Sequence, residues 1–307
     1  MRLLLHVPKA PDEWRDAFVR ALPGTEVRAW APGPAWQADY AAFWHPPREL
    51  LDGQARLKAA FNLAAGVDAT LRSLALPPGV PLVRLEDAGM GKQMEEYVAW
   101  AVLRYFRRLD DYARQQARAE WRVHRPPRHD EFPTGVMGLG VLGLRLAAML
   151  RALGFPVLGW SASRKVLDGV RTFAGAGELD AFLRATRALV CMLPLTPDTA
   201  GLLNRATLGR LPPGAYVINV ARGGIVVDDD LLALLDSGHL AGATLDAFHA
   251  EPLPAAHRFW SHPKVFLTPH CSALTLVEDS VAQVAGKIRA FERGEAVTGV
   301  VDRARGY

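Results

Sequence analysis

The chain has 307 residues, of which 50% are hydrophobic and 22% are charged. This length exceeds what one hydrophobic core usually supports, so we expect a globular protein of two domains. The net charge of +4 comes from Lys and Arg residues scattered among acids, without a basic tract, which argues against a nucleic-acid-binding protein.

The two cysteines, Cys191 and Cys271, lie in no CxxC motif and in no Cys/His ligand spacing. We therefore expect neither a disulfide framework nor a structural metal. The apolar part of Met1–Pro8 is too short for a signal peptide, and no run of about 18 apolar residues predicts a membrane span. These features favour a soluble, cytoplasmic protein without a membrane partner.

The first part of the chain alternates between expected strands and helices. Strands are predicted at 2–7, 41–44, 59–63 and 81–84, and a helix over Pro11–Leu22. This βα rhythm is typical of a mainly parallel sheet. A long helix is then expected from about Lys92 to Ala117, with an apolar face made of Met94, Val98, Ala101, Val102, Tyr105 and Leu109. The segment Trp121–Pro133, with three prolines and five charged residues, predicts an irregular connector or arm.

A second βα series begins at Thr134. Strands are expected at 135–137, 156–160, 188–193, 215–220, 242–245 and 265–267, and helices at 142–153 and 228–235. The apolar run Ala188–Leu193 indicates a strand covered on both faces. A last helix over about Thr275–Arg293 is compatible with packing on either domain.

A glycine-rich turn, Gly138–Gly143 (GLGVLG), lies between the first strand and the first helix of this second series. In a dinucleotide site Gly138 permits a tight turn, Gly140 permits close approach of the pyrophosphate, and Gly143 permits close packing of helix on strand. Val141 and Leu142 then lie at the helix N-terminus, which favours phosphates. The alternative is a βα turn with incidental glycines.

The end of the next strand indicates which dinucleotide is bound. An NAD site carries an Asp or Glu about 20 residues after the glycine turn, to bond the ribose hydroxyls. Here Ser161, Ser163, Arg164 and Lys165 occupy that segment, and the first acid is Asp168. Because these side chains suit a 2′-phosphate, NADP(H) is favoured and NAD(H) stays possible. A solvated Arg-Lys pair is the alternative.

Four polar side chains follow three later strands of the same series. Arg222 lies just after one strand, Asp246 and Glu251 after the next, and His270 after the third. Open α/β sheets bind ligands at the carboxyl ends of their strands, so we expect these residues at one edge of the sheet. Each of them alone is as compatible with a structural role.

These segments resemble the D-isomer-specific 2-hydroxyacid dehydrogenase family over essentially the whole chain. The markers are the glycine turn, Leu193–Thr196 (LPLT), Asn219–Gly224 (NVARGG), Leu245–Glu251 and Pro269-His270. The resemblance implies that Arg222, Glu251 and His270 are catalytic. It also implies cofactor contacts for Leu193, Pro194, Thr199, Val220, Ala221 and, at the nicotinamide carboxamide, Asp246.

The family fold implies a Rossmann-type doubly wound parallel sheet, inserted as a cofactor domain into a smaller flavodoxin-like α/β substrate domain. On this basis we expect residues 1–98 to begin the substrate domain, 99–275 to bind the cofactor, and 276–307 to return to the substrate domain. Ala65, Gly66 and Val67 are expected to hold the substrate carboxylate through backbone N–H groups, together with Arg222. Trp44 is either a wall of the substrate pocket or a core residue.

A narrower likeness, carried by Phe43–Pro47, Ala64–Asp68, Arg84–Gly91 and Trp160–Lys165, points to a branch that reduces glyoxylate and hydroxypyruvate and prefers NADPH. The expected mechanism is hydride transfer to the keto carbon, with His270 as proton donor oriented by Glu251 and with Arg222 polarising the carbonyl. Two enzymes of other specificity remain open: a broader 2-ketoacid reductase and an NAD-dependent D-2-hydroxyacid dehydrogenase. A protein of another class, a catalytically silent dinucleotide sensor, also remains open.

The resemblance further implies a homodimer, with the helix Lys92–Ala117 and the arm that follows it as the candidate interface. Trp121 in that arm either contacts the partner's pocket or is an ordinary packed or exposed residue.

Overall fold

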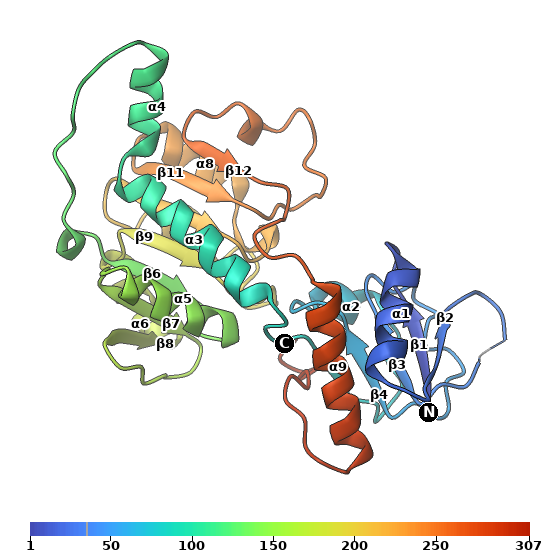
Figure 1. Cartoon of the computed structure of the whole chain (residues 1–307). Helices are drawn as coiled ribbons and strands as arrows, with labels where there is room; N and C mark the ends of the chain where they lie inside the picture. The colour runs from blue at the N-terminus through green and yellow to red at the C-terminus, as the bar shows by residue number, and fades with distance from the viewer. Residues whose placement is uncertain (35) are drawn as a thin grey trace. The chain divides into compact units, whose positions relative to one another are not determined.

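The computed structural model describes residues 1–34 and 36–307, which divide into two compact units. Unit 1 comprises Met1–Met90 and Leu274–Tyr307, and unit 2 comprises Gly91–Ala273. Unit 2 is therefore one continuous segment inserted between two pieces of unit 1 (Figure 1). Each unit contains a parallel sheet with helices, which confirms the α/β fold class expected from the βα rhythm.

The sheet of unit 1 has the strand order β2-β1-β3-β4-β5, and every neighbouring pair in it is parallel. This is the flavodoxin-like order 2-1-3-4-5. Its strands are β1 Arg2–His6, β2 Glu26–Ala29, β3 Tyr40–Phe43, β4 Ala59–Asn62 and β5 Leu82–Arg84. The central strands β3 and β4 are buried along their whole length, because helices and loops cover both faces.

The helices of unit 1 are α1 Pro11–Ala21, α2 Asp68–Ser73 and α9 Val277–Glu292. Helix α1 begins with Pro11, followed by Asp12 and Glu13, which suit the positive end of the helix dipole. Helix α9 packs against α1, so the C-terminal helix belongs to unit 1. Glu292 at its end accepts hydrogen bonds from Tyr40 Oη at 2.6 Å and Lys58 Nζ at 2.7 Å.

The sheet of unit 2 has the order β12-β11-β10-β9-β6-β7-β8 and is also parallel throughout. Its strands are β6 Thr134–Met137, β7 Val157–Ser161, β8 Val170–Ala174, β9 Ala188–Cys191, β10 Ala215–Asn219, β11 Leu240–Leu245 and β12 Val265–Leu267. The chain runs outward from β6 to β8 and then returns to β9 beside β6. The strand order thus reverses between β6 and β9, which is the point where doubly wound sheets bind ligands.

Helices cover both faces of this sheet (Figure 1). Apolar residues of α3 Met90–Phe106 and α5 Val141–Ala152 share one core cluster with one side of β6, β9 and β10. Those of α6 Gly175–Arg184, α7 Arg205–Leu208 and α8 Asp228–Asp236 pack on the other side. The continuous apolar runs of β9 and β10 follow from this burial on both faces.

The prediction of one continuous helix over Lys92–Ala117 is wrong. This stretch is broken into α3 and α4 Leu109–Ala117, with Arg108 in the left-handed region at φ 57°. Asp110 and Asp111 begin the new helix at its positive end and pair with Arg104 and Arg108. Leu109, expected on the apolar face, is 48% exposed because the break turns it away from the core.

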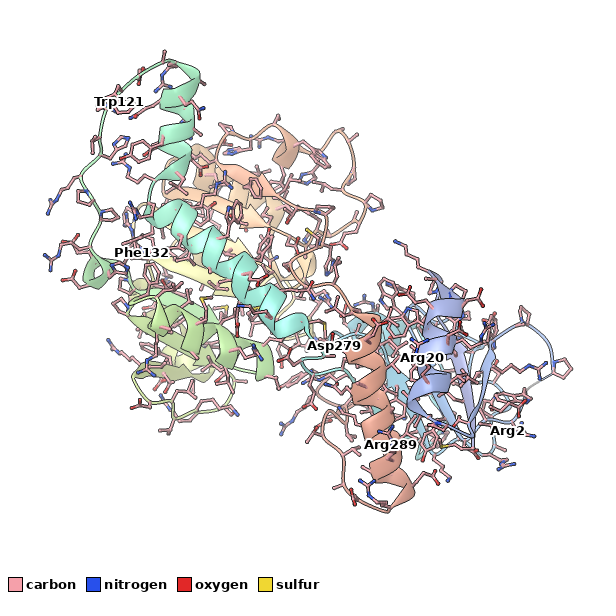
Figure 2. All side chains as sticks on the ribbon, in the orientation of Figure 1. Arg2, Arg20, Trp121, Phe132, Asp279 and Arg289 are labelled. Carbon is pink, nitrogen blue, oxygen red and sulfur yellow. The ribbon has the colours of Figure 1, made fainter. Side chains whose placement is uncertain are left out.

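Several elements were not expected from the sequence, among them β2, β8, α2 and α6. Strands β2 and β8 lie at the edges of their sheets, so most of their residues are only partly buried and carry no clear apolar pattern. Residues 118–133, called the arm below, are irregular apart from one 3-10 turn at His129–Glu131, and they include the irregular segment expected over Trp121–Pro133. Trp121 lies near the start of this arm, shortly after the end of α4, and is 99% exposed (Figure 2).

Candidate active site

The glycine turn lies at the reversal of strand order in unit 2. Gly138 follows β6 with φ 108°, and a Cβ there would lie 2.8 Å from the Met192 carbonyl oxygen after β9. At Gly143 a Cβ would lie 1.9 Å from the Gly138 carbonyl oxygen. Both positions therefore require glycine, because the turn folds tightly between two strands and the first turn of α5.

Gly140 differs from these two glycines, because the fold itself does not require it. Its φ is −79°, and within the described chain no atom lies within 4 Å of the place a Cβ would take. Gly140 is the N-cap of α5, and no described side chain caps the helix there. Open space beside uncapped N–H groups fits the pyrophosphate of a dinucleotide. Val141 and Leu142 form the first turn of that helix, as expected.

The loop after β7 carries the residues expected to select the dinucleotide. Ser161 ends the strand and its Oγ donates to the Ser163 carbonyl at 2.7 Å. Ser163, Arg164 and Lys165 are exposed. Arg164 bonds Thr172 O at 3.0 Å and pairs with Glu178. A hydroxyl and two cations at an exposed turn suit a phosphate, although one of the cations already has a carboxylate partner.

The loops after β9 and β10 lie at the same edge of the sheet. Leu193 is buried and Pro194 is partly buried. The Thr199 hydroxyl donates to Pro194 O at 2.6 Å and accepts from Thr196 N at 2.8 Å, so it stabilises its own turn. Val220 and Ala221 are buried directly after β10. The cofactor contacts expected of these residues stay predictions.

Arg222 lies two residues beyond Val220, in a loop held by Asn219 at the end of β10. Asn219 Nδ2 donates to Arg222 O at 3.1 Å, and Asn219 Oδ1 accepts from Ala221 N at 3.2 Å. Arg222 Nη1 donates to Ala221 O at 2.8 Å. A Cβ at Gly223 would lie 1.9 Å from the carbonyl carbon of Phe248. The loop of Arg222 is thus in backbone contact with the loop after β11, which carries Glu251.

Glu251 and His270 form a hydrogen-bonded pair. His270 Nδ1 lies 2.8 Å from Glu251 Oε2, and Glu251 Oε1 accepts from Phe248 N at 2.9 Å. The two side chains are 41% and 38% exposed, so solvent and a small ligand reach them. Because Glu251 occupies Nδ1, the nitrogen open to a substrate is Nε2. The expected juxtaposition of these two residues is present.

Asp246 has a structural role that the sequence did not predict. Its carboxylate is 1% exposed and accepts hydrogen bonds from Thr268 Oγ1 at 2.6 Å, Cys271 N at 2.9 Å and Ser272 N at 2.8 Å. These bonds clamp both sides of His270, whose backbone has φ 52°. The carboxylate holds this loop, and a contact with nicotinamide stays a prediction.

The Asp246 clamp extends to helix α3 through Tyr97. Tyr97 Oη lies 2.5 Å from Thr268 Oγ1, which donates its own proton to Asp246, so Tyr97 is the donor in this contact. Burial raises the pKa of the Tyr97 hydroxyl and keeps it protonated. The sequence showed Tyr97 as an ordinary helix residue, because its partner is 171 positions away.

The residues expected to bind substrate in unit 1 lie after β3 and β4. Trp44 directly follows β3 and is partly buried against His45, with ring centroids 4.9 Å apart. Asn62, buried at the end of β4, donates to the carbonyls of Ala64 at 2.9 Å and Gly66 at 3.0 Å.

Asn62 determines the direction of the peptide groups in this loop. Since the C=O and N–H of a trans peptide point in opposite directions, the N–H groups of Ala65 and Val67 point away from Asn62. That orientation suits an anion. Asn62 was not predicted from the sequence; the signal that could have found it is a polar residue at the end of an apolar strand, and Asn219 has the same signal.

Within residues 1–34 and 36–307, no group of three or more His, Cys, Asp or Glu side chains is arranged to hold a metal ion. In the same residues, no helix is both long and apolar enough to cross a membrane.

Comparison with known proteins identifies the family. Residues 99–272 match the model of the D-isomer specific 2-hydroxyacid dehydrogenase, NAD binding domain. Glyoxylate/hydroxypyruvate reductase A of Serratia proteamaculans is 50% identical over 301 residues, which cover 96% of each chain. The same-named protein of Citrobacter koseri is 49% identical over 96% of each chain. The chain therefore belongs to the D-isomer specific 2-hydroxyacid dehydrogenase family, as the sequence motifs indicated.

Two solved structures extend this similarity to the whole fold. A D-isomer specific 2-hydroxyacid dehydrogenase from Xanthobacter autotrophicus Py2, in complex with NADPH and MES, superposes with a TM-score of 0.94 at 39% identity, over 99% of each chain. An NADPH-dependent glyoxylate/hydroxypyruvate reductase from Sinorhizobium meliloti, in complex with NADP and sulfate, gives 0.92 at 39% identity over 100% of this chain and 99% of that one.

The glycine turn generates a first prediction. Gly140→Ala lowers the thermal unfolding midpoint only slightly, because its Cβ meets open space and only the N-cap preference is lost, but it weakens NADP⁺ binding by about 1–3 kcal/mol, as an inserted methyl group does in a filled site. Gly143→Ala is the matched comparison, and it lowers the midpoint because its Cβ collides with the Gly138 carbonyl. Calorimetric titration and thermal melting measure both effects. Wild-type NADP⁺ affinity in Gly140→Ala contradicts the assignment.

A second prediction concerns the Asp246 clamp. In Asp246→Asn, an NH2 group replaces one of the two carboxylate oxygens. Because NH2 cannot accept a hydrogen bond, one backbone N–H loses its partner, which lowers the free energy of unfolding by about 1–3 kcal/mol. The loop around His270 then loosens and the imidazole is less well placed. We expect kcat to fall at least about tenfold, which corresponds to about 1.4 kcal/mol in activation free energy. Asp12→Asn, at a side chain 80% exposed, is the control. A kcat within twofold of wild type in Asp246→Asn rules out the clamp.

Proposed function

We propose that this enzyme reduces glyoxylate to glycolate and hydroxypyruvate to glycerate, with NADPH as the preferred reductant. The observation that carries the proposal is the His270–Glu251 pair at 2.8 Å, in a loop next to that of Arg222 at the ligand-binding edge of the sheet. The named relatives that are half identical over nearly the full length support the substrates.

Two features support NADPH over NADH. The loop after β7 offers Ser163, Arg164 and Lys165, and no carboxylate stands at the strand end where an NAD site has one. The similar structures from Xanthobacter and Sinorhizobium are complexes with NADPH and NADP. The 2′-phosphate is a dianion near neutral pH, so cationic side chains on this loop favour it over a hydroxyl.

The reaction needs an anion clamp, a proton donor and an orienting group. A bound NADPH supplies the hydride that reaches the keto carbon. Arg222 bonds the substrate carboxylate and keto oxygen, which stabilises the charge that develops there. His270, as imidazolium, donates the proton from Nε2 to that oxygen, so one hydride and one proton convert C=O to CH–OH. Glu251 holds Nδ1 and keeps the ring in this orientation.

The substrate roles of Trp44 and Ala65–Val67 belong to the same proposal. The outward N–H groups of Ala65 and Val67 match the carboxylate common to both substrates. Assignment of unit 1 to substrate and unit 2 to cofactor, and a cytoplasmic location, are parts of the proposal as well.

A rate panel tests the function. With NADPH, purified protein reduces glyoxylate and hydroxypyruvate faster than pyruvate or phenylpyruvate, and NADH gives lower kcat/KM. His270→Gln lowers kcat at least about 100-fold, the scale of general acid catalysis. The matched control is His262→Gln, at a histidine that lies shortly before the first residue of β12. Near-normal turnover in His270→Gln excludes the proton donor, and NADPH binding without any reduction indicates a sensor instead.

We further propose a homodimer in which the arm, residues 118–133, is part of the interface. Trp121 is 99% and Val123 is 81% exposed, and exposed apolar side chains that lie close together are typical of protein–protein contact surfaces. Sedimentation equilibrium gives a dimer mass for wild type, and the double variant Trp121→Ser/Val123→Ser dissociates at higher concentration. A monomeric wild type at micromolar concentration contradicts this.

A further inference from the structure

The loop after β7, residues 161–165, is held from outside by one residue of the neighbouring edge strand. Strand β8 pairs in parallel with β7, with Thr172 opposite Gly159. Thr172 Oγ1 donates to Lys165 O at 2.6 Å, and Thr172 O accepts from Arg164 Nη1 at 3.0 Å. Thr172 therefore contacts the backbone of one cationic residue and the side chain of the other.

Two further contacts complete this arrangement. Glu178 in the first turn of α6 accepts from Ala174 N at 2.7 Å and pairs with Arg164 Nη2. The Arg164 guanidinium and the Ala174 N–H hold the pKa of Glu178 below its ordinary value, so it stays ionised. From within the loop, Ser161 Oγ bonds Ser163 O at 2.7 Å. These hydrogen bonds hold the loop after β7 from both sides.

The stability contributed by these contacts is small, because Arg164 and Glu178 are 53% and 39% exposed and exposed ion pairs add little. These contacts matter more for the affinity of the loop for a ligand. A loop held in one conformation loses less entropy when it takes up a ligand. An arginine has five N–H donors, so bonds from Nη1 to Thr172 and from Nη2 to Glu178 leave donors for a phosphate.

We propose that Thr172 is a positioning residue for binding of the adenosine 2′-phosphate. Thr172 holds the Arg164 side chain and the Lys165 backbone at the place where that phosphate binds. The proposal rests on the NADPH preference proposed above and deepens it, because it assigns part of the discrimination to a strand residue outside the loop. Thr172 is absent from the sequence motif, since its side chain acts on a segment seven residues earlier.

The variants separate the hydroxyl from the shape of the side chain. Thr172→Val keeps the branched side chain and the carbonyl but removes the bond to Lys165 O. Thr172→Ser restores a hydroxyl. Thr134→Val makes the same change at the start of β6, where the hydroxyl makes a 3.4 Å bond to Phe132 O, and it serves as the control.

Binding of two fragments isolates the 2′-phosphate. Calorimetry compares adenosine 2′,5′-bisphosphate with adenosine 5′-monophosphate, which lacks that group. We expect Thr172→Val to bind the bisphosphate about 3- to 10-fold more weakly, the usual effect of one hydrogen bond, with the monophosphate within twofold of wild type. Thr172→Ser and Thr134→Val match wild type. In kinetics, KM for NADPH rises by the same factor, while kcat and the KM for NADH stay unchanged.

The outcomes distinguish this inference from the proposed function. If wild type prefers the bisphosphate and Thr172→Val does so equally, the positioning role is wrong and the NADPH preference stands. Equal weakening of both fragments shows a general structural effect and also overturns the role. If wild type binds both fragments equally, the NADPH preference itself fails, and the role of Thr172 fails with it.

Discussion

The hydrogen bonding of the buried Asp246 carboxylate is the interaction on which the geometry of the loop around His270 depends. His270 has a left-handed backbone at φ 52°, which costs an L-residue about 1–2 kcal/mol. Hydrogen bonds to a charged group contribute about 1.5–3 kcal/mol each, and Asp246 accepts them from Thr268, Cys271 and Ser272 around His270. The clamp therefore outweighs the strain. It holds His270 in a backbone conformation that a flexible loop rarely adopts, and in this conformation the imidazole contacts Glu251.

The same edge of the sheet depends on close backbone approach at two further places. Gly223 lets the loop of Arg222 contact the backbone of Phe248, to which Glu251 is bonded. Gly138 lets the turn after β6 contact the segment after β9. In both cases a side chain would separate loops that follow neighbouring strands. The two glycines thus allow loops that follow neighbouring parallel strands to touch through their backbones.

Local patterns account for the part of this structure that the sequence predicted. Apolar runs marked β9 and β10, and polar residues after strand ends marked Arg222, Glu251 and His270. The family followed from those motifs. What the sequence did not show depends on contacts between distant segments or on weak local signals. Tyr97 bonds Thr268 across 171 positions. The edge strand β8 has no clear apolar pattern, and the helix break at Arg108 lies in a stretch with helical periodicity on both sides.

Short polar side chains at strand ends explain how the loops present their backbone groups. Asn62 ends β4 and Asn219 ends β10, and both are at most 2% exposed. Each bonds a carbonyl of the loop that follows, Gly66 in one case and Arg222 in the other. A carbonyl drawn toward the asparagine turns the N–H of the same peptide in the opposite direction. The two units of this enzyme thus fix the orientation of a loop peptide by the same device, a buried asparagine at a strand end, although their sheets have different strand orders.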